Sequence, residues 1–388
     1  MREVSIIGAY ETVHGNHSKR MLRDLVSEAG NGVIQDSGID RKEIQAVFVG
    51  NYAGQEFNNQ NTMGSYVATV LGLGDRPAMK LEGACASGGL AFKAGFDAIA
   101  SGAYDTVLVF GVEKMNTKDP TTTMEIVSRG QDSEFEGGFC VSGPSGFALN
   151  AIRHMHEFGT TREMLGVVAE KNYFHGSKNP FAHKQKVIPL KNILNARIVT
   201  TPFGFHDMSL VTDAATAVIL TTREKAKSIS KKPILVKGTG QGGDYFTLSM
   251  KRDSVSFPAT EKAAFQAFKM AGVDRKDIDV LECHDCFTIT EIINLEDLGF
   301  VEKGKGGGFT LDGHSRLGGK LPVNTSGGLK AKGHPIGATG VGQVVEMVYQ
   351  LRETSGERQV KNARTALTHV LGGPGAVCVV NILQRDFE

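Results

Sequence analysis

The chain has 388 residues and a formal net charge of +1, with 43 basic residues against 42 acidic ones. With 40% hydrophobic residues, this is the balance of a soluble globular protein long enough for two core-forming units. The interspersed charges exclude the basic excess of a nucleic-acid or membrane-surface protein, and no secretory or membrane-spanning run is visible, so we expect a cytoplasmic protein.

The N-terminal part predicts alternating helices and buried strands. Residues 22–36 have the apolar spacing of a helix, the turn SGIDRKEI follows at 37–44, and the strand-like run AVFVGN comes next. Residues 83–111 then predict a turn, a second helix and another strand. Cys85 lies where that turn meets the helix. The helix dipole and free N–H groups favour a thiolate there, so we expect a lowered thiol pKa. The alternative is a small buried cysteine that fills a tight turn.

The middle of the chain has a different texture, richer in proline, histidine and polar residues. We interpret residues 119–209 as a partly helical insertion that sits above the first half. TDAATAVILTT at 212–222 predicts a strand that returns to the first half, and 225–233 predicts a linker. GTGQGG at 238–243 has the spacing of a dinucleotide fingerprint, but no apolar helix start follows it, so we predict a turn.

The last third repeats the first unit. A predicted helix at 261–270, the turn AGVDRKDI at 271–278 and the run VLECHD match the first copy, with Asp274 placed 234 positions after Asp40. This match in matching context indicates two copies of one α/β unit. A glycine-rich loop and helix at 324–351 and a closing strand at 365–383 complete the second copy. We therefore expect an N-terminal half (1–118 plus 210–230), the insertion (119–209) and a C-terminal half (231–388), packed together as layers.

Cys283, His284, Asp285 and Cys286 stand together after a predicted strand of the second copy. A zinc site would need a second paired cluster, which the sequence lacks. A redox dithiol is not excluded by the spacing. In the alignment of the repeat, Cys283 lies inside the strand and the next residues lie at its carboxyl end, where ligands of open α/β sheets gather. This favours His284 and Cys286 as site residues and Cys283 as a core residue.

His334 is held between Gly333 and Pro335 on a predicted loop. A neutral imidazole there could take a proton from a thiol or a carbon acid near pH 7. The alternative is a loop histidine that bonds only to backbone.

The segments GACASGGLA, ECHDCF, GHPIGATG and THVLGGPGAV, in this order, together resemble the thiolase superfamily over essentially the full chain. HDCF in place of the common NEAF is similar to the sterol-carrier-protein-x branch, which includes archaeal acetoacetyl-CoA thiolases and bacterial relatives. The usual ending CxGGGxG is absent, because His369 stands at the position of its cysteine and Leu371 at that of its first glycine. The resemblance implies the thiolase fold, two similar α/β halves in a five-layer αβαβα sandwich with an inserted loop domain.

The resemblance also implies roles for individual residues. Cys85 would be the nucleophile that accepts the acyl group, and His334 would take its proton. His284 would complete a first oxyanion hole, and Cys286 would act as acid and base at the substrate α-carbon. The backbone N–H groups of Cys85 and Leu371 would form a second oxyanion hole.

The implied activity is a reversible Claisen condensation or thiolysis of a 3-oxoacyl-CoA through an acyl-cysteine, with no bound metal or cofactor. Acetoacetyl-CoA is the default substrate, and a bulkier or aromatic, benzoylsuccinyl-CoA-like thioester is the alternative. The glycine-rich stretch 134–147 is expected to line the acyl pocket. The resemblance further implies a homodimer or homotetramer and admits a small partner with a zinc ribbon and an OB-fold. A related condensing enzyme, a non-catalytic acyl-CoA-binding scaffold and a zinc or redox protein are the competing interpretations.

Overall fold

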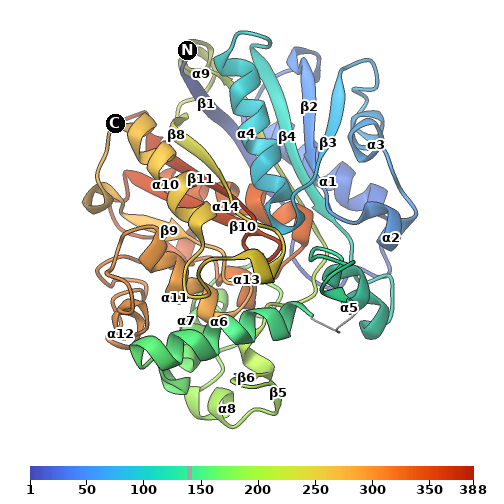
Figure 1. The fold of residues 1–388 in the computed structure, drawn as a ribbon. Coiled ribbons are helices and arrows are strands. Elements are labelled where there is room, and N and C mark those ends of the chain that lie inside the picture. Colours follow the sequence, from blue (N-terminus) through green and yellow to red (C-terminus); the bar gives the residue numbers. More distant parts are fainter. Residues whose placement is uncertain (138–141) are drawn as a thin grey trace.

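The structure is a computed structural model that describes residues 1–137 and 142–388. Its main sheet joins strands in the order β3-β2-β4-β7-β1-β8-β11-β10-β9 (Figure 1). The bounds are β1 (Val4–Glu11), β2 (Ala46–Gly50), β3 (Ala78–Leu81), β4 (Thr106–Glu113), β7 (Ala214–Thr222), β8 (Ile234–Gly243), β9 (Val280–Glu282), β10 (Thr365–Gly372) and β11 (Val377–Arg385). A small hairpin adds β5 (Ile198–Thr200) and β6 (Phe203–Gly204).

The helices lie on both faces and at one end of this sheet. Their bounds are α1 (Leu22–Ser37), α2 (Gly54–Asn58), α3 (Met63–Val70), α4 (Ser87–Ala100), α5 (Pro120–Ser128), α6 (Gly143–Phe158), α7 (Arg162–Gly176), α8 (Leu190–Leu194), α9 (Arg223–Ile229), α10 (Pro258–Ala271), α11 (Thr288–Asp297), α12 (Gly306–Leu311), α13 (Gly328–Ala331) and α14 (Ile336–Leu351). Among the described residues, none of these helices is long and apolar enough to cross a membrane.

The two halves of the sheet fold toward each other around α4 and α14. These helices pack together in the middle, α4 against β2 and β4 and α14 against β4, β7 and β10, while α1 and α10 cover the outer faces (Figure 1). The halves are joined where β1 pairs with β8, a contact of only Ser5 with Leu235 and Ile6 with Ile234. The result is the predicted order of helix, sheet, helix, sheet and helix.

Glycines let α4 and α14 approach to backbone contact. A Cβ on Gly340 would lie 2.3 Å from the amide nitrogen of Gly89, and one on Gly88 would lie 2.8 Å from the carbonyl oxygen of Gly337. No side chain fits at these distances, so the crossing requires glycine. It holds the first turns of both helices side by side, and Cys85 and His334 lie just before these turns.

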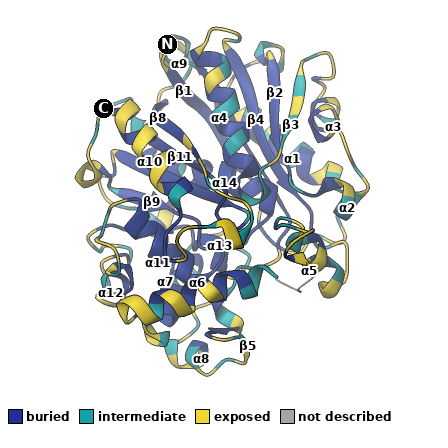
Figure 2. Cartoon of the chain, in the orientation of Figure 1, coloured by how far each residue is buried: buried dark blue, intermediate teal, exposed yellow. Residues whose placement is uncertain are grey.

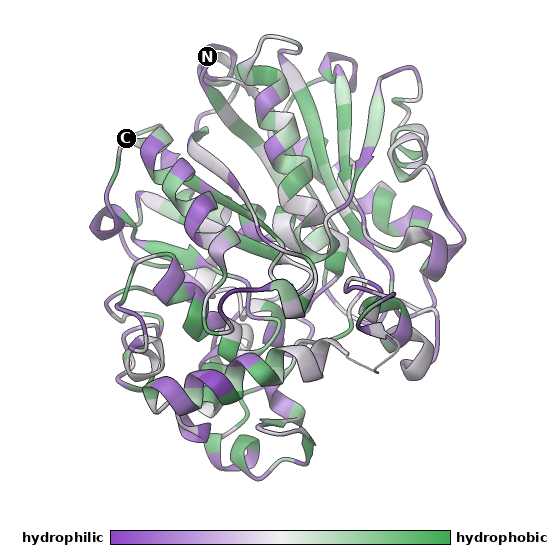
Figure 3. Cartoon of the chain, viewed as in Figure 1, coloured by the Kyte–Doolittle hydropathy of each residue, from purple (hydrophilic) through white to green (hydrophobic). Residues whose placement is uncertain are grey.

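The predicted repeat is confirmed element by element. Helix α1 ends at Gly38 with φ 72°, and α10 ends at Gly272 with φ 63°, both in the left-handed region that favours glycine. A short 3₁₀ turn follows in each copy, at Arg41–Glu43 and at Arg275–Asp277. The strands β2 and β9 come next and are fully buried. The strands of the N-terminal half are mainly hydrophobic (Figure 3).

The predicted turn at 238–243 is wrong, because these residues form the end of β8. The glycines face α10 rather than a nucleotide. A Cβ on Gly238, Gly240 or Gly242 would lie 2.3, 2.1 or 1.9 Å from a carbonyl oxygen of that helix. The motif therefore serves close helix–sheet packing. The predicted linker at 225–233 is largely helical, since α9 extends to Ile229.

The sequence suggested that the insertion sits above the first half, and most of it does not. Helices α6 and α7 pack against the second half, where Phe147 and Leu165 share a core with Ile289 and Ile292 of α11. Helix α11 is buried along its whole length and needs this cover (Figure 2). Helix α5 stays with the first half through Ile126, and the carbonyl oxygen of Phe181 accepts from the N–H of His14 there at 2.9 Å. The apolar stripe of α6 thus packs against the apolar surface of the second half.

Candidate active site

Cys85 lies in a 3₁₀ turn, Ala84–Ala86, immediately before α4. The preceding Ala84 has φ 49°, an unusual value for a residue with a side chain. Ser87 holds this conformation, because its hydroxyl donates to the carbonyl oxygen of Ala84 at 2.6 Å and accepts from the N–H of Gly83 at 3.1 Å. A strained turn that the surrounding structure fixes in this way is typical of functional sites.

His334 precedes α14 and faces Cys85. Its Nε2 lies 3.2 Å from Sγ of Cys85, and its Nδ1 lies 2.7 Å from Oγ1 of Thr339. Its backbone N–H donates to the carbonyl oxygen of Leu210 at 3.1 Å. The two residues that the sequence singled out separately, 249 positions apart, therefore form a hydrogen-bonded pair of nucleophile and base.

The predicted lowering of the Cys85 pKa is not what the structure gives. Burial raises the pKa of Cys85 to about 12, although its own N–H and that of Gly373 act in the opposite direction. Burial also lowers the pKa of His334 to about 3. Desolvation outweighs the helix start, a balance that the sequence does not reveal. At neutral pH both groups are uncharged, so the proton must pass from sulfur to Nε2 as the sulfur reacts.

His284 completes a compact group with Cys85 and His334. Its ring centroid lies 5.3 Å from that of His334 with the planes at 80°, and donor atoms of the three residues lie within 4.8 Å of one another. Burial, followed by the charge of His334, lowers the pKa of His284 well below its usual value. A neutral imidazole can donate an N–H to an oxygen that becomes negative.

His369 holds the backbone next to this ring. Its Nδ1 accepts the N–H of His284 at 3.3 Å, and its Nε2 lies 2.9 Å from Oγ1 of Thr260. The carbonyl oxygen of His284 accepts from the Asn294 side chain at 2.8 Å. The position of the missing C-terminal cysteine is therefore occupied by a residue that fixes the loop of His284.

The two cysteines of the HDCF segment and its flank separate. Cys283 is fully buried, and its Sγ lies 3.8 Å from Nδ2 of Asn324. Cys286 lines the pocket that contains Cys85, and its Sγ lies 3.9 Å from Oγ1 of Thr290. Burial, followed by the charge of Cys85, raises the pKa of Cys286 well above its usual value, so it is a thiol. The different surroundings of the two sulfurs disfavour the zinc and redox-dithiol interpretations.

Asp285 anchors the loop that carries His284 and Cys286. Its carboxylate accepts the N–H groups of Leu329 at 2.7 Å and Lys330 at 3.3 Å and an N–H of the Asn172 side chain at 2.8 Å. The first two belong to α13, which leads to His334. Sequence patterns gave no role to Asp285, because its partners come from distant segments.

Residues 208–211 connect both sides of the site, and the sequence did not single them out. The N–H of Ser209 donates to the carbonyl oxygen of Cys286 at 2.9 Å, and Leu210 accepts the N–H of His334. Buried Lys330 donates to the carbonyl oxygen of Met208. One extended segment thus touches the loops of both Cys286 and His334.

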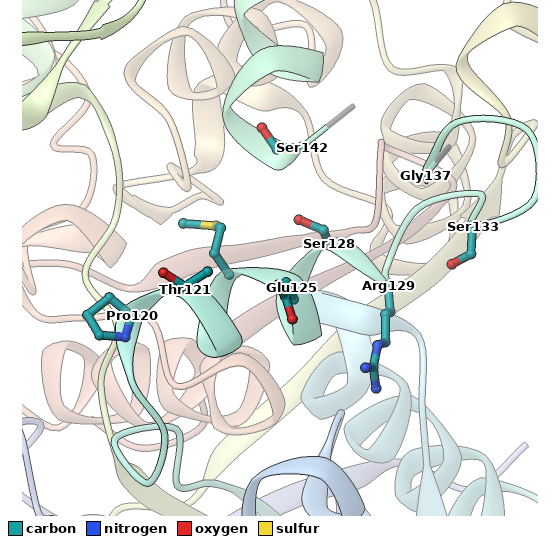
Figure 4. Close-up of a pocket in the computed structure, with 9 residues that line it drawn as sticks. Pro120, Thr121, Glu125, Ser128, Arg129, Ser133, Gly137 and Ser142 are labelled. Atoms are coloured by element: carbon teal, nitrogen blue, oxygen red, sulfur yellow. The ribbon is translucent and has the colours of Figure 1, made fainter. Parts of the chain in front are cut away.

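A pocket of about 310 Å³ is lined by Cys85, Cys286, His334 and residues 208–211. Gly143, Pro144 and Phe147 of the stretch 134–147 line it, whereas residues 138–141 of that stretch lie outside the described residues. Phe147 and Phe287 stack in its wall with centroids 4.9 Å apart. A neighbouring hollow is lined by α5, the loop after it and the start of α6 (Figure 4), and it shares Pro120 and Met124 with the pocket.

The structure places Leu371 in β10 with its side chain in the core. Its N–H remains a predicted oxyanion donor. Besides the N–H of Cys85 itself, the N–H of Gly373 lowers the pKa of the Cys85 thiol against burial, and Gly373 also lines the pocket. Gly373 has φ 58° and was not singled out in the sequence, although the run of glycines after β10 was the available signal.

Comparison with known proteins covers nearly the whole chain. The family described as "Thiolase, N-terminal domain" matches residues 4–201, and "Thiolase C-terminal domain-like" matches residues 240–385. An acetyl-CoA acetyltransferase of Methanothermobacter thermautotrophicus is 42% identical over 99% of this chain and 100% of its own length. The benzoylsuccinyl-CoA thiolase subunit BbsB of Thauera aromatica is 33% identical over 96% of this chain and 95% of its own length.

A solved structure titled "Ltp2-ChsH2(DUF35) aldolase" has the same fold. It superposes with a TM-score of 0.85 at 24% sequence identity, over 100% of this chain and 98% of that chain.

Proposed function

The chain belongs to the thiolase family and is a CoA-dependent acyltransferase, and we propose that it interconverts acetoacetyl-CoA plus coenzyme A with two acetyl-CoA. The single observation that carries the proposal is the 3.2 Å contact between Nε2 of His334 and Sγ of Cys85. The archaeal acetyl-CoA acetyltransferase, 42% identical over essentially the full length, supports the acetyl group as the default. Coenzyme A is substrate and product, and the reaction needs no bound cofactor.

In the direction of thiolysis, we propose that the Cys85 thiol attacks the 3-oxo carbon while His334 takes its proton. The bond between C2 and C3 then breaks, which leaves an acetyl group on Cys85 and the enolate of acetyl-CoA. Cys286 protonates that enolate at C2 and is left as a thiolate. Coenzyme A finally gives its thiol proton to the Cys286 thiolate and takes the acetyl group, and His334 returns its proton to the sulfur of Cys85 as that sulfur leaves.

Two oxygens become negative in this sequence, and separate donors are available for them. The N–H groups of Cys85 and Gly373 both lower the pKa of the Cys85 thiol against burial, which supports a role for them as donors to the oxygen of the group attached to the sulfur. His334 lines the pocket, and His284 lies next to it with ring centroids 5.3 Å apart. We propose that His284, and His334 once it carries the proton of Cys85, donate to the thioester oxygen of the enolate. Each such donor is worth about 3 kcal/mol in other acyl-transfer enzymes.

A bulkier or aromatic 3-oxoacyl-CoA is the second candidate substrate. The stacked rings of Phe147 and Phe287 offer an apolar wall to a ring, and the Thauera relative is named for benzoylsuccinyl-CoA.

The domain division, the oligomeric state and a partner protein also belong to the proposal. We propose the division into 1–118 plus 210–230, 119–209 and 231–388, and a homodimer or homotetramer. A small partner protein with a zinc ribbon and an OB-fold is supported by the similar structure, whose title names a DUF35 protein. The cytoplasmic location expected from the sequence remains a prediction.

The decisive test is mass spectrometry of the intact chain and its peptides after mixing with acetyl-CoA or acetoacetyl-CoA. We expect the Cys85 peptide to gain about 42 Da, the mass of an acetyl group that replaces a hydrogen. The added mass should be lost when coenzyme A is added. No adduct from any thioester, together with a Cys85 that does not react with iodoacetamide, would move the non-catalytic scaffold to the front.

A further inference from the structure

Gln131 brings a polar group without a protein partner into the wall of the pocket. It is 7% exposed, and its Oε1 has no hydrogen-bond partner among the described residues. It lines the pocket that contains Cys85, His334 and Cys286. Leaving a buried amide oxygen unpaired costs about 1–3 kcal/mol, so its placement in a ligand pocket points to a partner on the ligand.

The backbone around Gln131 places it close to the nucleophile. A Cβ on the preceding Gly130 would lie 3.5 Å from Cβ of Ala84, the residue before Cys85. On its other side, a Cβ on Gly146 would lie 3.5 Å from Nε2 of Gln131. The amide therefore lies between the turn of the nucleophile and the first part of α6.

The pocket has an exposed rim and a buried wall, and Gln131 belongs to the buried wall. The exposed lining residues are Lys118, Pro120, Met124 and Val211. The nucleotide of coenzyme A is too large for about 310 Å³, so the thioester arm must enter across that rim. Gln131 shares the buried part of the lining with apolar residues such as Met115, Phe147 and Phe287. This buried, mainly apolar part suits the acyl group better than the arm.

We propose that Gln131 is a specificity residue that hydrogen-bonds to a polar group on the acyl chain. The site then accepts, besides the acetyl group, longer acyl groups with a hydroxyl a few bonds from the thioester carbon, in preference to apolar chains of the same size. A hydroxyl suits this position because it can donate its hydrogen to the unpaired Oε1 of Gln131. This inference rests on the proposed function, since it deepens the substrate range of the same site.

The test compares acylation of Cys85 by three thioesters in the full-length wild type and in Gln131→Met. Pentanoyl-CoA and 4-hydroxybutyryl-CoA form a matched pair that differs by a terminal methyl against a hydroxyl, and acetyl-CoA reports the basal reaction. We expect the wild type to acylate faster with 4-hydroxybutyryl-CoA than with pentanoyl-CoA by about tenfold, the value of one buried hydrogen bond. In Gln131→Met the ratio should fall to one or reverse, with the acetyl-CoA rate of the same variant as the reference.

Gln343→Met is the matched control. Gln343 is also buried, at 4% exposure, and both its amide atoms lack partners among the described residues, but it lines a different, small cavity. Gln343→Met should leave the ratio of the rates with 4-hydroxybutyryl-CoA and pentanoyl-CoA unchanged. An equal ratio in wild type and Gln131→Met would overturn the proposal, and an equal loss with all three thioesters would assign Gln131 to the arm of coenzyme A instead. A wild type that acetyl-CoA does not acylate would instead contradict the proposed function itself.

Discussion

The hydroxyl of Thr339 sets which nitrogen of His334 carries the proton. Its single hydrogen is donated to the carbonyl oxygen of Pro335 at 3.0 Å, so Oγ1 must accept the hydrogen of Nδ1 of His334, 2.7 Å away. Nε2 therefore has a free lone pair, and this lone pair faces the thiol of Cys85. We infer the tautomer from this network of hydrogen bonds.

Replacing Thr339 should thus impair the base without removing it. We expect Thr339→Val to slow acylation of Cys85 by about tenfold to hundredfold, because a misoriented base loses part of the 10²–10⁴ that general-base catalysis supplies. KM should change little. Thr339→Ser keeps the hydroxyl and should retain the wild-type rate. Single-turnover acylation with acetyl-CoA measures the rate of each variant. A wild-type rate in Thr339→Val would refute the role of Thr339 in orienting His334.

The pH dependence of Cys85 reactivity follows from the raised pKa. With the thiol pKa at about 12, the thiolate fraction grows with every step of pH between 7 and 10. Alkylation of the free enzyme by iodoacetamide should therefore rise tenfold per pH unit across that range, whereas a free thiol would level off above its usual pKa of about 8.5. A plateau below pH 9 would mean that the start of α4, rather than burial, determines the pKa of the Cys85 thiol.

Cys286→Ala should separate the two half-reactions. Because Cys85 and His334 remain in place, acetyl-CoA should still acylate Cys85. Formation of acetoacetyl-CoA should fall by at least about 10², the lower range for loss of an acid/base group. Exchange of the α-hydrogens of acetyl-CoA with deuterated water should fall with it. Loss of acylation together with exchange would mean that Cys286 supports the nucleophile instead.

Glu11 and Lys332 form a buried ion pair between the halves, with Nζ 2.7 Å from the carboxylate and Glu11 fully buried. Burial opposes ionisation of Glu11, but Lys332 and His14 outweigh it and lower its pKa to about 2. A lowered carboxyl pKa contributes stability above the unfolded value of about 4.3 that is lost as pH falls toward 2. Glu11→Gln should lower the free energy of unfolding by about 3–5 kcal/mol at pH 7, because Lys332 keeps an unpaired buried charge.

The stability difference between wild type and Glu11→Gln should shrink as the pH falls below 4.3. Thermal unfolding followed by circular dichroism at pH 7 and pH 3.5 measures it. Asp274→Asn serves as the control, since Asp274 and Lys276 are 3.9 Å apart and largely exposed, and exposed pairs contribute little. A difference that grows in acid would show that Glu11 is protonated at neutral pH.

Gly340→Ala should disturb the crossing of α4 and α14. Its Cβ would lie 2.3 Å from the amide nitrogen of Gly89, and backbone does not yield. We expect a lower Tm and an acylation rate reduced by about 10² or more, since a shift of about 1 Å can cost that much. Gly308→Ala in α12 has nothing within 4 Å of the new Cβ and should not lower either quantity. A folded Gly340→Ala variant that acylates at the wild-type rate would show that the helix crossing does not determine the geometry of the site.

The sequence predicted candidate site residues that the structure brings to one pocket, but it did not predict their pKa values. Cys85, His334 and Cys286 could be found because each sits at a local signal, a helix start, a constrained loop or the end of a strand. The raised pKa of Cys85 could not, because burial depends on residues from the whole chain. Gly373 and Ser209 act through backbone groups, which leave little trace in residue type.

The fold was predicted where its signals are local and missed where packing decides. The repeat is marked by glycine caps at Gly38 and Gly272, and it was read correctly. The glycines of 238–243 fit a turn as well as a strand until the approach of α10 is known. The position of α6 depends on which apolar surface it meets, and the sequence alone did not choose between the two halves.

The segment 208–211 has a consequence for how selectivity can change. Ser209 bonds to the loop of the acid and Leu210 to the loop of the base, and both residues also line the pocket. A substitution that reshapes this wall to admit a new substrate also moves the two proton-transferring groups. Variation of substrate range along this wall is therefore tied to the rates of both half-reactions. Gln131 lies outside this segment and offers a place where the substrate can change and the timing of proton transfer stays the same.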